Sequence, residues 1–140
     1  MSALLTCRSC MTDREGIAKA LKQLGVPEDK IQMAVQEALT LKGYGAQTSK
    51  VEILVANKDY HNGYSDFGFN RVNGAKEYSM LVDDMDDVGK LAEKAGVNGK
   101  FSEAVTKWYA AFKAQEALKK QGMYGKIKED GENLVLVTRG

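Results

Sequence analysis

The chain has 140 residues, of which 44% are hydrophobic and 28% are charged, and this length suits one globular domain with a core of its own. Twenty basic and nineteen acidic residues leave a net charge of +1, so no strong field attracts the whole protein to nucleic acid or to an anionic membrane. The apolar runs are far shorter than the roughly twenty residues of a membrane-spanning helix, and the N-terminus lacks the layout of a signal peptide. We therefore expect a cytoplasmic protein without a membrane partner.

The first segment carries both cysteines of the chain, Cys7 and Cys10. Residues 3–11 alternate in polarity as a strand does, and this alternation sends the two sulfurs to opposite faces. A redox pair normally begins a helix, and a zinc site needs further cysteine or histidine ligands. We expect no redox or metal role, a protected Cys7 and a Cys10 that reacts with thiol reagents.

The sequence TDRE at residues 12–15 predicts the start of the first helix, because it fits a capping box with Thr12 as the N-cap. The helix is therefore expected to start at Asp13, and Gly25 and Pro27 end it. Residues 28–40 then predict a short helix followed by a strand.

The middle of the chain reads mainly as strands. Alternating apolar residues predict strands at 51–56, 66–72 and 78–82, the last two joined by an Asn-Gly turn. The polar loop of residues 58–65 contains His61, the only histidine, and we expect its side chain to be solvated.

The last third begins with four aspartates at positions 83, 84, 86 and 87, which we assign to helix capping rather than to a metal site. Apolar spacing predicts helices at 88–95 and 102–120, the second capped by Ser102. Its face of Val105, Trp108, Tyr109 and Phe112 is expected in the core. A second hairpin follows, with an Asp-Gly turn at 130–131.

Strands grouped together, with helices from both ends of the chain, predict an α+β fold. We expect a single domain, mainly an antiparallel sheet with helices packed on one face.

Several stretches then carry a family likeness: DREGIAKALKQLG, LKGYGAQTSKVEILV, SDFGFNRVNGAKEYSMLVDD and the C-terminal KEDGENLVLVTR. In this order they resemble the Ycf thirty-five family, a domain of unknown function, over nearly the whole chain. The resemblance implies one such domain over residues 1–140. It also implies a source among chloroplasts, cyanobacteria, other bacteria or phages, hence the cytoplasm, the plastid stroma or a host cytoplasm. In that family the first strand has an aliphatic residue at the site of Cys7 and a polar one at that of Cys10, so no thiol function is implied.

One loop combines groups suited to a ligand. Lys42, Tyr44, Gln47 and Lys50 offer positive charge, stacking and hydrogen bonds around Gly43-Tyr44-Gly45, and Asp66 follows on a later loop. These five residues are our candidate binding site for a small anion or nucleotide. The alternative is that the glycines only permit a tight turn and that Tyr44 packs.

No catalytic signature is present, so we predict no catalytic residue, metal or cofactor. We expect a non-catalytic binding or adaptor domain that holds a protein partner or a small anionic or nucleotide ligand, with strand edges that allow a homo-oligomer. A small enzyme acting on nucleotides is the alternative, with Tyr44, Lys50, His61 and Asp66 brought together. A third, less favoured alternative is weak nucleic-acid binding by the C-terminal lysines, at positions 113, 119, 120, 126 and 128.

Overall fold

The computed structural model describes residues 4–8, 11–71, 74–131 and 133–139, with the side chains of residues 11–71, 74–131 and 133–138. Its main sheet has the strand order β1-β7-β6-β5-β2, and every neighbouring pair is antiparallel. The strands are β1 (Leu4–Arg8), β2 (Gln32–Met33), β5 (Ile53–Val55), β6 (Phe67–Asn70) and β7 (Ser79–Asp83). The antiparallel α+β fold predicted from the sequence is confirmed.

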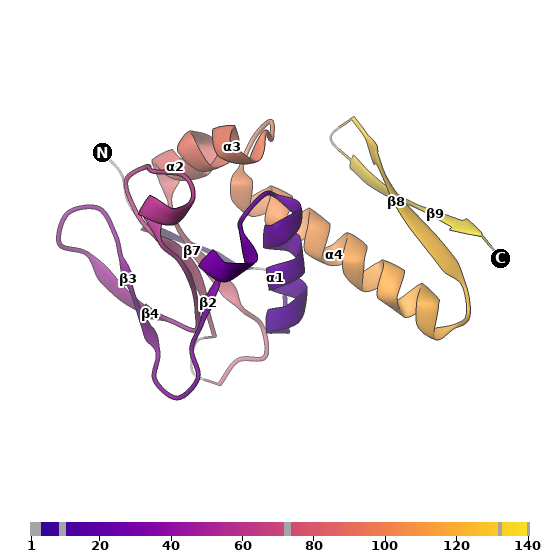
Figure 1. The fold of residues 1–140 in the computed structure, drawn as a ribbon, viewed down its shortest axis with the longest axis horizontal. Helices are drawn as coiled ribbons and strands as arrows, with labels where there is room; N and C mark the ends of the chain where they lie inside the picture. Colours follow the sequence, from indigo (N-terminus) through magenta and orange to yellow (C-terminus); the bar gives the residue numbers. More distant parts are fainter. Residues whose placement is uncertain (1–3, 9–10, 72–73, 132, 140) are drawn as a thin grey trace.

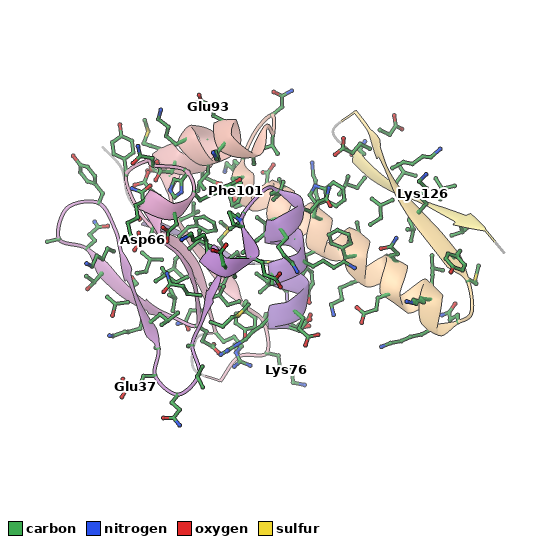
Figure 2. All side chains as sticks on the ribbon, in the orientation of Figure 1. Glu37, Asp66, Lys76, Glu93, Phe101 and Lys126 are labelled. Carbon is green, nitrogen blue, oxygen red and sulfur yellow. The ribbon has the colours of Figure 1, made fainter. Side chains whose placement is uncertain are left out.

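The helices lie over one face of this sheet (Figure 1). They are α1 (Arg14–Gln23), the short α2 (Asp84–Val88) and α3 (Lys90–Ala95), and the long α4 (Phe101–Lys120). Alternation along the strands turns Ile53, Phe67 and Phe69 toward the helices, and these side chains share one buried cluster with residues of α1, α3 and α4. The rings of Phe67 and Phe101 meet edge to face with their centroids 5.3 Å apart. Figure 2 shows Phe101 among the crowded side chains of this core.

The opposite face of the sheet is covered by a hairpin, β3 (Leu39–Lys42) and β4 (Thr48–Val51). Leu41 and Val51 of the hairpin form a second buried cluster with Leu54 of β5. The sheet is therefore the middle layer between helices and hairpin, which is why β5 is apolar on both of its faces.

The chain ends in what we call the C-terminal arm, residues 110–139. It consists of the second half of α4 and the hairpin of β8 (Tyr124–Asp130) and β9 (Asn133–Arg139), which stands away from the main sheet (Figure 1). Leu118 and Leu136 both lie so close to Gly125 that a Cβ there would overlap both side chains. Of the arm residues whose burial the structure describes, none is fully buried.

The predicted cap of the first helix is wrong by one residue. Asp13, and not Thr12, is the N-cap, because its Oδ2 accepts a hydrogen bond of 2.9 Å from the amide of Gly16. The amide of Thr12 instead donates to the hydroxyl of Tyr109, at 3.0 Å. The amide of Thr12, which the side chain of Glu15 would have bound in a capping box, is thus bound by a residue 97 positions away.

The predicted cap of the long helix is also wrong. Helix α4 begins at Phe101, and its N-cap, Lys100, makes no side-chain cap. Ser102 lies inside the first turn, where its amide and hydroxyl donate to the two carboxylate oxygens of Asp87 at 2.7 and 2.8 Å. The buried carboxylate therefore caps α4 from another helix.

Three smaller expectations are refined. The short helix predicted after Pro27 is a single 3-10 turn, Glu28–Lys30, and the helix predicted at 88–95 is divided between α2 and α3. Strand β1 is an edge strand whose position 7 pairs with Met80. Cys10 and the side chain of Cys7 lie outside the described residues, so the predicted difference in thiol reactivity stays a prediction.

Candidate functional site

The five predicted ligand residues lie on or beside the β3-β4 hairpin. Lys42, Gln47 and Lys50 are exposed, and Lys50 Nζ donates to Thr40 Oγ1 at 2.9 Å across the strands. Tyr44 is half-exposed and meets the equally exposed ring of Tyr64 edge to face, with centroids 5.6 Å apart. The hairpin thus presents these groups to solvent.

Asp66, labelled in Figure 2, binds backbone amides on both sides of the loop in which it lies. Its Oδ2 accepts from the amide of Lys42 at 2.9 Å and its Oδ1 from the amide of Asn57 at 2.8 Å. Both carboxylate oxygens therefore hold backbone, which joins the hairpin to the loop that follows β5.

The expectation that His61 is solvated is wrong. The side chains of His61 and Asp86 are both 0% exposed, with Nε2 3.4 Å from Asp86 Oδ2 and 2.8 Å from the carbonyl of Ser65. The Asp86 carboxylate also accepts from the amides of Tyr64 and Ser65, at 2.9 and 3.1 Å. The loop is held over α2 because the Asp86 carboxylate accepts hydrogen bonds from the loop amides.

Burial lowers the pKa of His61, against the opposing effects of the Ser65 carbonyl and of Asp86. A carbonyl can only accept, so Nε2 carries the proton, and Nδ1 has no hydrogen-bond partner among the described residues. The imidazole is a neutral part of the core and contacts the rings of Tyr60 and Phe67, which also contact each other.

This placement bears on the enzyme alternative. Among Tyr44, Lys50, His61 and Asp66, the described contacts include no hydrogen bond or ring contact that joins two of the four; Asp66 acts on His61 only through its charge. The structure does not assemble these groups as a reactive cluster.

A charged cluster ties α1 to the sheet. Arg14 and Arg71 both bind Glu52 Oε1, at 2.8 and 2.7 Å, and Arg71 Nε reaches Oε2 at 2.9 Å. The hydrogen bonds from Arg71, opposed by burial and supported by those from Arg14, lower the pKa of Glu52 to about 2. Arg71 also lies over the ring of Tyr78, 4.9 Å from its centroid. This cluster has the geometry of a structural clamp.

The candidate site is a cavity of about 480 Å³ between α1, the second half of α4 and the start of β8. We call it the arm cavity. Helix α1 provides Gly16 and Lys19, α4 provides Phe112 and Lys119, and other lining residues are Asp13, Glu15, Lys113, Gln115, Glu116, Met123, Tyr124 and Gly125. Its volume falls within the range of roughly 300–1,000 Å³ that is usual for ligand pockets.

One end of the arm cavity is fixed by Asp13. Its Oδ1 accepts from the Tyr109 hydroxyl at 2.6 Å and from Lys113 Nζ at 2.8 Å. Burial opposes ionisation of Asp13, but the hydrogen bonds from Lys113, Tyr109 and Gly16 outweigh it and lower the pKa of the carboxyl. Lys113 also pairs with Glu116 at 3.4 Å. One lysine thus serves two carboxylates, so these three lining residues together carry a net charge of −1.

The remaining charged lining residues are Lys19, Lys119 and Glu15, none of which has an ion pair within 4.0 Å among the described residues. Lys19 Nζ lies 4.5 Å from the centroid of the Phe112 ring, and the ring of Tyr124 is 82% exposed at the rim. These three residues contribute a charge of +1 beside two aromatic rings, and the charged lining residues of the arm cavity as a whole sum to zero.

A smaller cavity of about 220 Å³ lies on the far side of the arm. Trp108 and Lys107 line it from α4, and Asn133 and Leu134 line it from the hairpin. It separates the tip of the hairpin from the loop that precedes α4.

Within the part of the chain that the structure describes, no group of three or more His, Cys, Asp or Glu could hold a metal ion. Two of the buried aspartates serve as caps: Asp87 binds Ser102 at the start of α4, and Asp83 Oδ1 accepts from the amides of Met85 and Asp86 at 2.9 and 3.0 Å. The capping expected of this acidic stretch is found at Asp83 and Asp87, whereas Asp86 binds the amides of the loop. None of the described helices is both long and apolar enough to cross a membrane.

Sequence reasoning did not find the arm cavity. Lys19, Phe112 and Tyr124 come from separate elements, and only the packing of α1 against α4 brings them together. Phe112, which was expected in the core, is only half-buried and lines the cavity.

Comparisons with known proteins assign the family. The searches of curated proteins and of solved structures found no match. The family model that matches residues 20–134 bears a different name from the Ycf thirty-five family, to which no finding links the chain, so that prediction was wrong. The match covers well over half of the 140 residues, and the chain therefore belongs to the family described as "Protein of unknown function (DUF1257)".

Proposed function

We propose that the protein is a non-catalytic binding domain that holds a small anionic ligand with a planar ring in the arm cavity. The observation that carries the proposal is the meeting of two uncommitted lysines, Lys19 and Lys119, with the rings of Phe112 and Tyr124 around about 480 Å³. The proposal keeps the ligand class expected from the sequence and moves its site from the β3-β4 hairpin to the arm.

Two lysines of the lining favour an anion at one place in the cavity. Asp13 and Glu116 share Lys113, and Glu15 lies at the exposed rim. The lining is therefore neutral as a whole, and a phosphate or carboxylate is favoured where Lys19 and Lys119 lie, because neither has an ion pair among the described residues. Lys19 and Lys119 come from different helices and approach a bound anion from two directions. A hydrogen bond to a charged group contributes about 1.5–3 kcal/mol.

The rings favour a planar ligand. Tyr124 is 82% exposed, so a flat group can stack on its ring without displacing core side chains. The ring of Phe112 already contacts Lys19 and the ring of Trp108, and it lines the cavity beside Lys19. An aromatic phosphate such as a nucleoside monophosphate joins both features in one molecule.

The proposal includes the cytoplasmic location, the protein partner and the homo-oligomer expected from the sequence. The enzyme and nucleic-acid alternatives stay predictions, and the first is weakened by the burial of His61.

The test is calorimetric titration of the full chain with AMP and phenyl phosphate, and with adenosine and inorganic phosphate as their halves. We expect the aromatic phosphates to bind more tightly than either half. Lys19→Ala or Lys119→Ala should raise their Kd about ten-fold or more, from the loss of one charge-assisted hydrogen bond.

Lys120→Ala is the matched control, because Lys120 is the exposed neighbour of Lys119 and does not line the cavity. An equal loss of affinity in this control would assign the effect to general charge. Equal binding of adenosine and AMP, or no binding by any of the four probes, would contradict the proposal.

A further inference from the structure

The hairpin of the C-terminal arm has open edges. Strands β8 and β9 are seven residues each and form a two-stranded sheet, so among the described residues no further strand pairs with either. Such edges carry rows of backbone donors and acceptors that readily pair with another strand.

The two edges differ in how far they are protected. Strand β8 carries Lys126, Lys128, Glu129 and Asp130, and Gln115 of α4 donates to the carbonyl of Gly125 at 2.8 Å. Strand β9 has the uninterrupted apolar run 134–137, without charge, proline or glycine. Charged side chains are the usual protection of an edge strand, so β9 is the exposed edge.

The sequence of β9 is complementary to itself. Antiparallel pairing of two copies about Leu136, the central residue of the strand, places Val135 of each copy opposite Val137 of the other. It also places Leu134 opposite Thr138, and Asn133 opposite position 139. No like charges meet in this register.

The same operation on β8 is unfavourable. Pairing about its central residue, Ile127, sets Lys126 of one copy directly opposite Lys128 of the other, twice. Like charges in directly opposed positions destabilise a strand pair. Charge therefore selects β9 and rejects β8.

The faces of the paired strands agree with this choice. Leu136 lies against Gly125 on the side where Leu118 of α4 also lies. By alternation Val135 and Val137 therefore point away from the helix, and each is 41% exposed. In the pair, the four valines of two copies form one apolar cluster. Figure 2 shows Lys126 on the hairpin, away from the core, where it borders that cluster.

We propose that the protein forms a homodimer through antiparallel pairing of β9 with β9 of a second copy, which creates a four-stranded sheet in the order β8-β9-β9-β8. The interface is isologous and closed, because the two-fold axis passes through Leu136 and leaves only the charged β8 strands at the outside. The dimer does not depend on the ligand proposed for the arm cavity.

The test uses a charge pair designed into β9. In V135E/V137E each new glutamate faces a lysine of its own hairpin, because Lys128 pairs with Val135 and Lys126 with Val137. Across the dimer, however, glutamate meets glutamate at both positions. The substitution therefore preserves the hairpin and opposes the dimer.

Sedimentation velocity of the full chain over a range of concentrations measures the outcome. We expect the wild type to sediment as a dimer, V135E/V137E to dissociate with a Kd raised at least about ten-fold, and V135T/V137T, which keeps the β-branched shape without charge, to remain dimeric. Circular dichroism should show the same folded structure in all three proteins.

A monomeric wild type, an undiminished V135E/V137E dimer, or dissociation of V135T/V137T would each overturn the proposal. Amide exchange of the wild type provides a measurement that needs no variant. Protection of β9 should grow with protein concentration, and protection that is independent of concentration would also overturn the dimer.

Discussion

Acidification should destabilise the protein through His61. The side chain is 0% exposed, its Nε2 proton is bound to the carbonyl of Ser65 at 2.8 Å, and its Nδ1 faces no acceptor among the described residues. A second proton would thus place an unpaired N–H and a charge in the core, where the Asp86 carboxylate, 3.4 Å from Nε2, offsets only part of the cost of burial. Burial is the main reason why the pKa of His61 is lowered from its ordinary 6.5.

The sign follows from the two states. The unfolded chain takes up the proton near pH 6.5 and the folded chain only at a lower pH, so between these values the unfolded state binds more protons. The contribution of His61 to the free energy of unfolding is complete above about pH 6.5 and is lost as the pH falls toward the folded-state pKa. Within that window the loss is about 1.4 kcal/mol per pH unit.

Two measurements check this prediction. His61 is the only histidine, so its imidazole signal in a proton NMR titration is unambiguous, and its midpoint should lie below 6.5. Urea unfolding between about pH 7.5 and 5 should give a falling free energy for the wild type, and a flatter profile for His61→Gln, which cannot titrate. A midpoint at or above 6.5, or identical pH profiles, would refute the reasoning.

Two further predictions concern the contacts that hold α1. Tyr109→Phe should lower the free energy of unfolding by about 1–2 kcal/mol in urea unfolding at neutral pH, because its hydroxyl donates to Asp13 at 2.6 Å; Tyr124→Phe, on an 82% exposed ring, is the control and should change little. Because the pKa of Glu52 is lowered from 4.5 to about 2, its stabilising effect is complete above pH 4.5 and is lost as the pH falls through about 2. In Glu52→Gln the free energy of unfolding, measured with urea below about pH 4.5, should therefore fall less steeply with falling pH than in the wild type. The same pH dependence in both proteins would contradict the shared ion pair with the two arginines.

The elements that sequence predicted well are those whose signals are local. The alternation at 66–72 and 78–82 gave a strand pair in which Phe69 faces Met80, and the Asp-Gly turn of the last hairpin has Gly131 at a φ of +62°, where glycine is favoured. Periodicity and turn chemistry involve neighbours in the chain, so one sequence suffices to recognise them.

The features that sequence missed depend on distant partners. His61 lies in a polar loop, and its burial follows from Asp86, 25 residues away, which gathers the loop amides. Likewise the capping of α1 changed because Tyr109 reaches Thr12 from the other end of the domain. A loop shows no periodic pattern of apolar residues from which its burial could be predicted. A buried polar group can be recognised only when the position of its hydrogen-bond partner is known.

The C-terminal arm is held by fewer buried contacts than the rest of the domain. Both buried clusters lie before residue 110, so detaching the hairpin from α4 uncovers half-buried side chains such as Leu118 and Leu136 and leaves both clusters whole. Local opening of the arm therefore costs less free energy than global unfolding. A ligand that binds only when the hairpin is packed on α4 raises the population of that packed state by mass action. The degree of order of the hairpin then measures the fraction of protein molecules that hold the ligand.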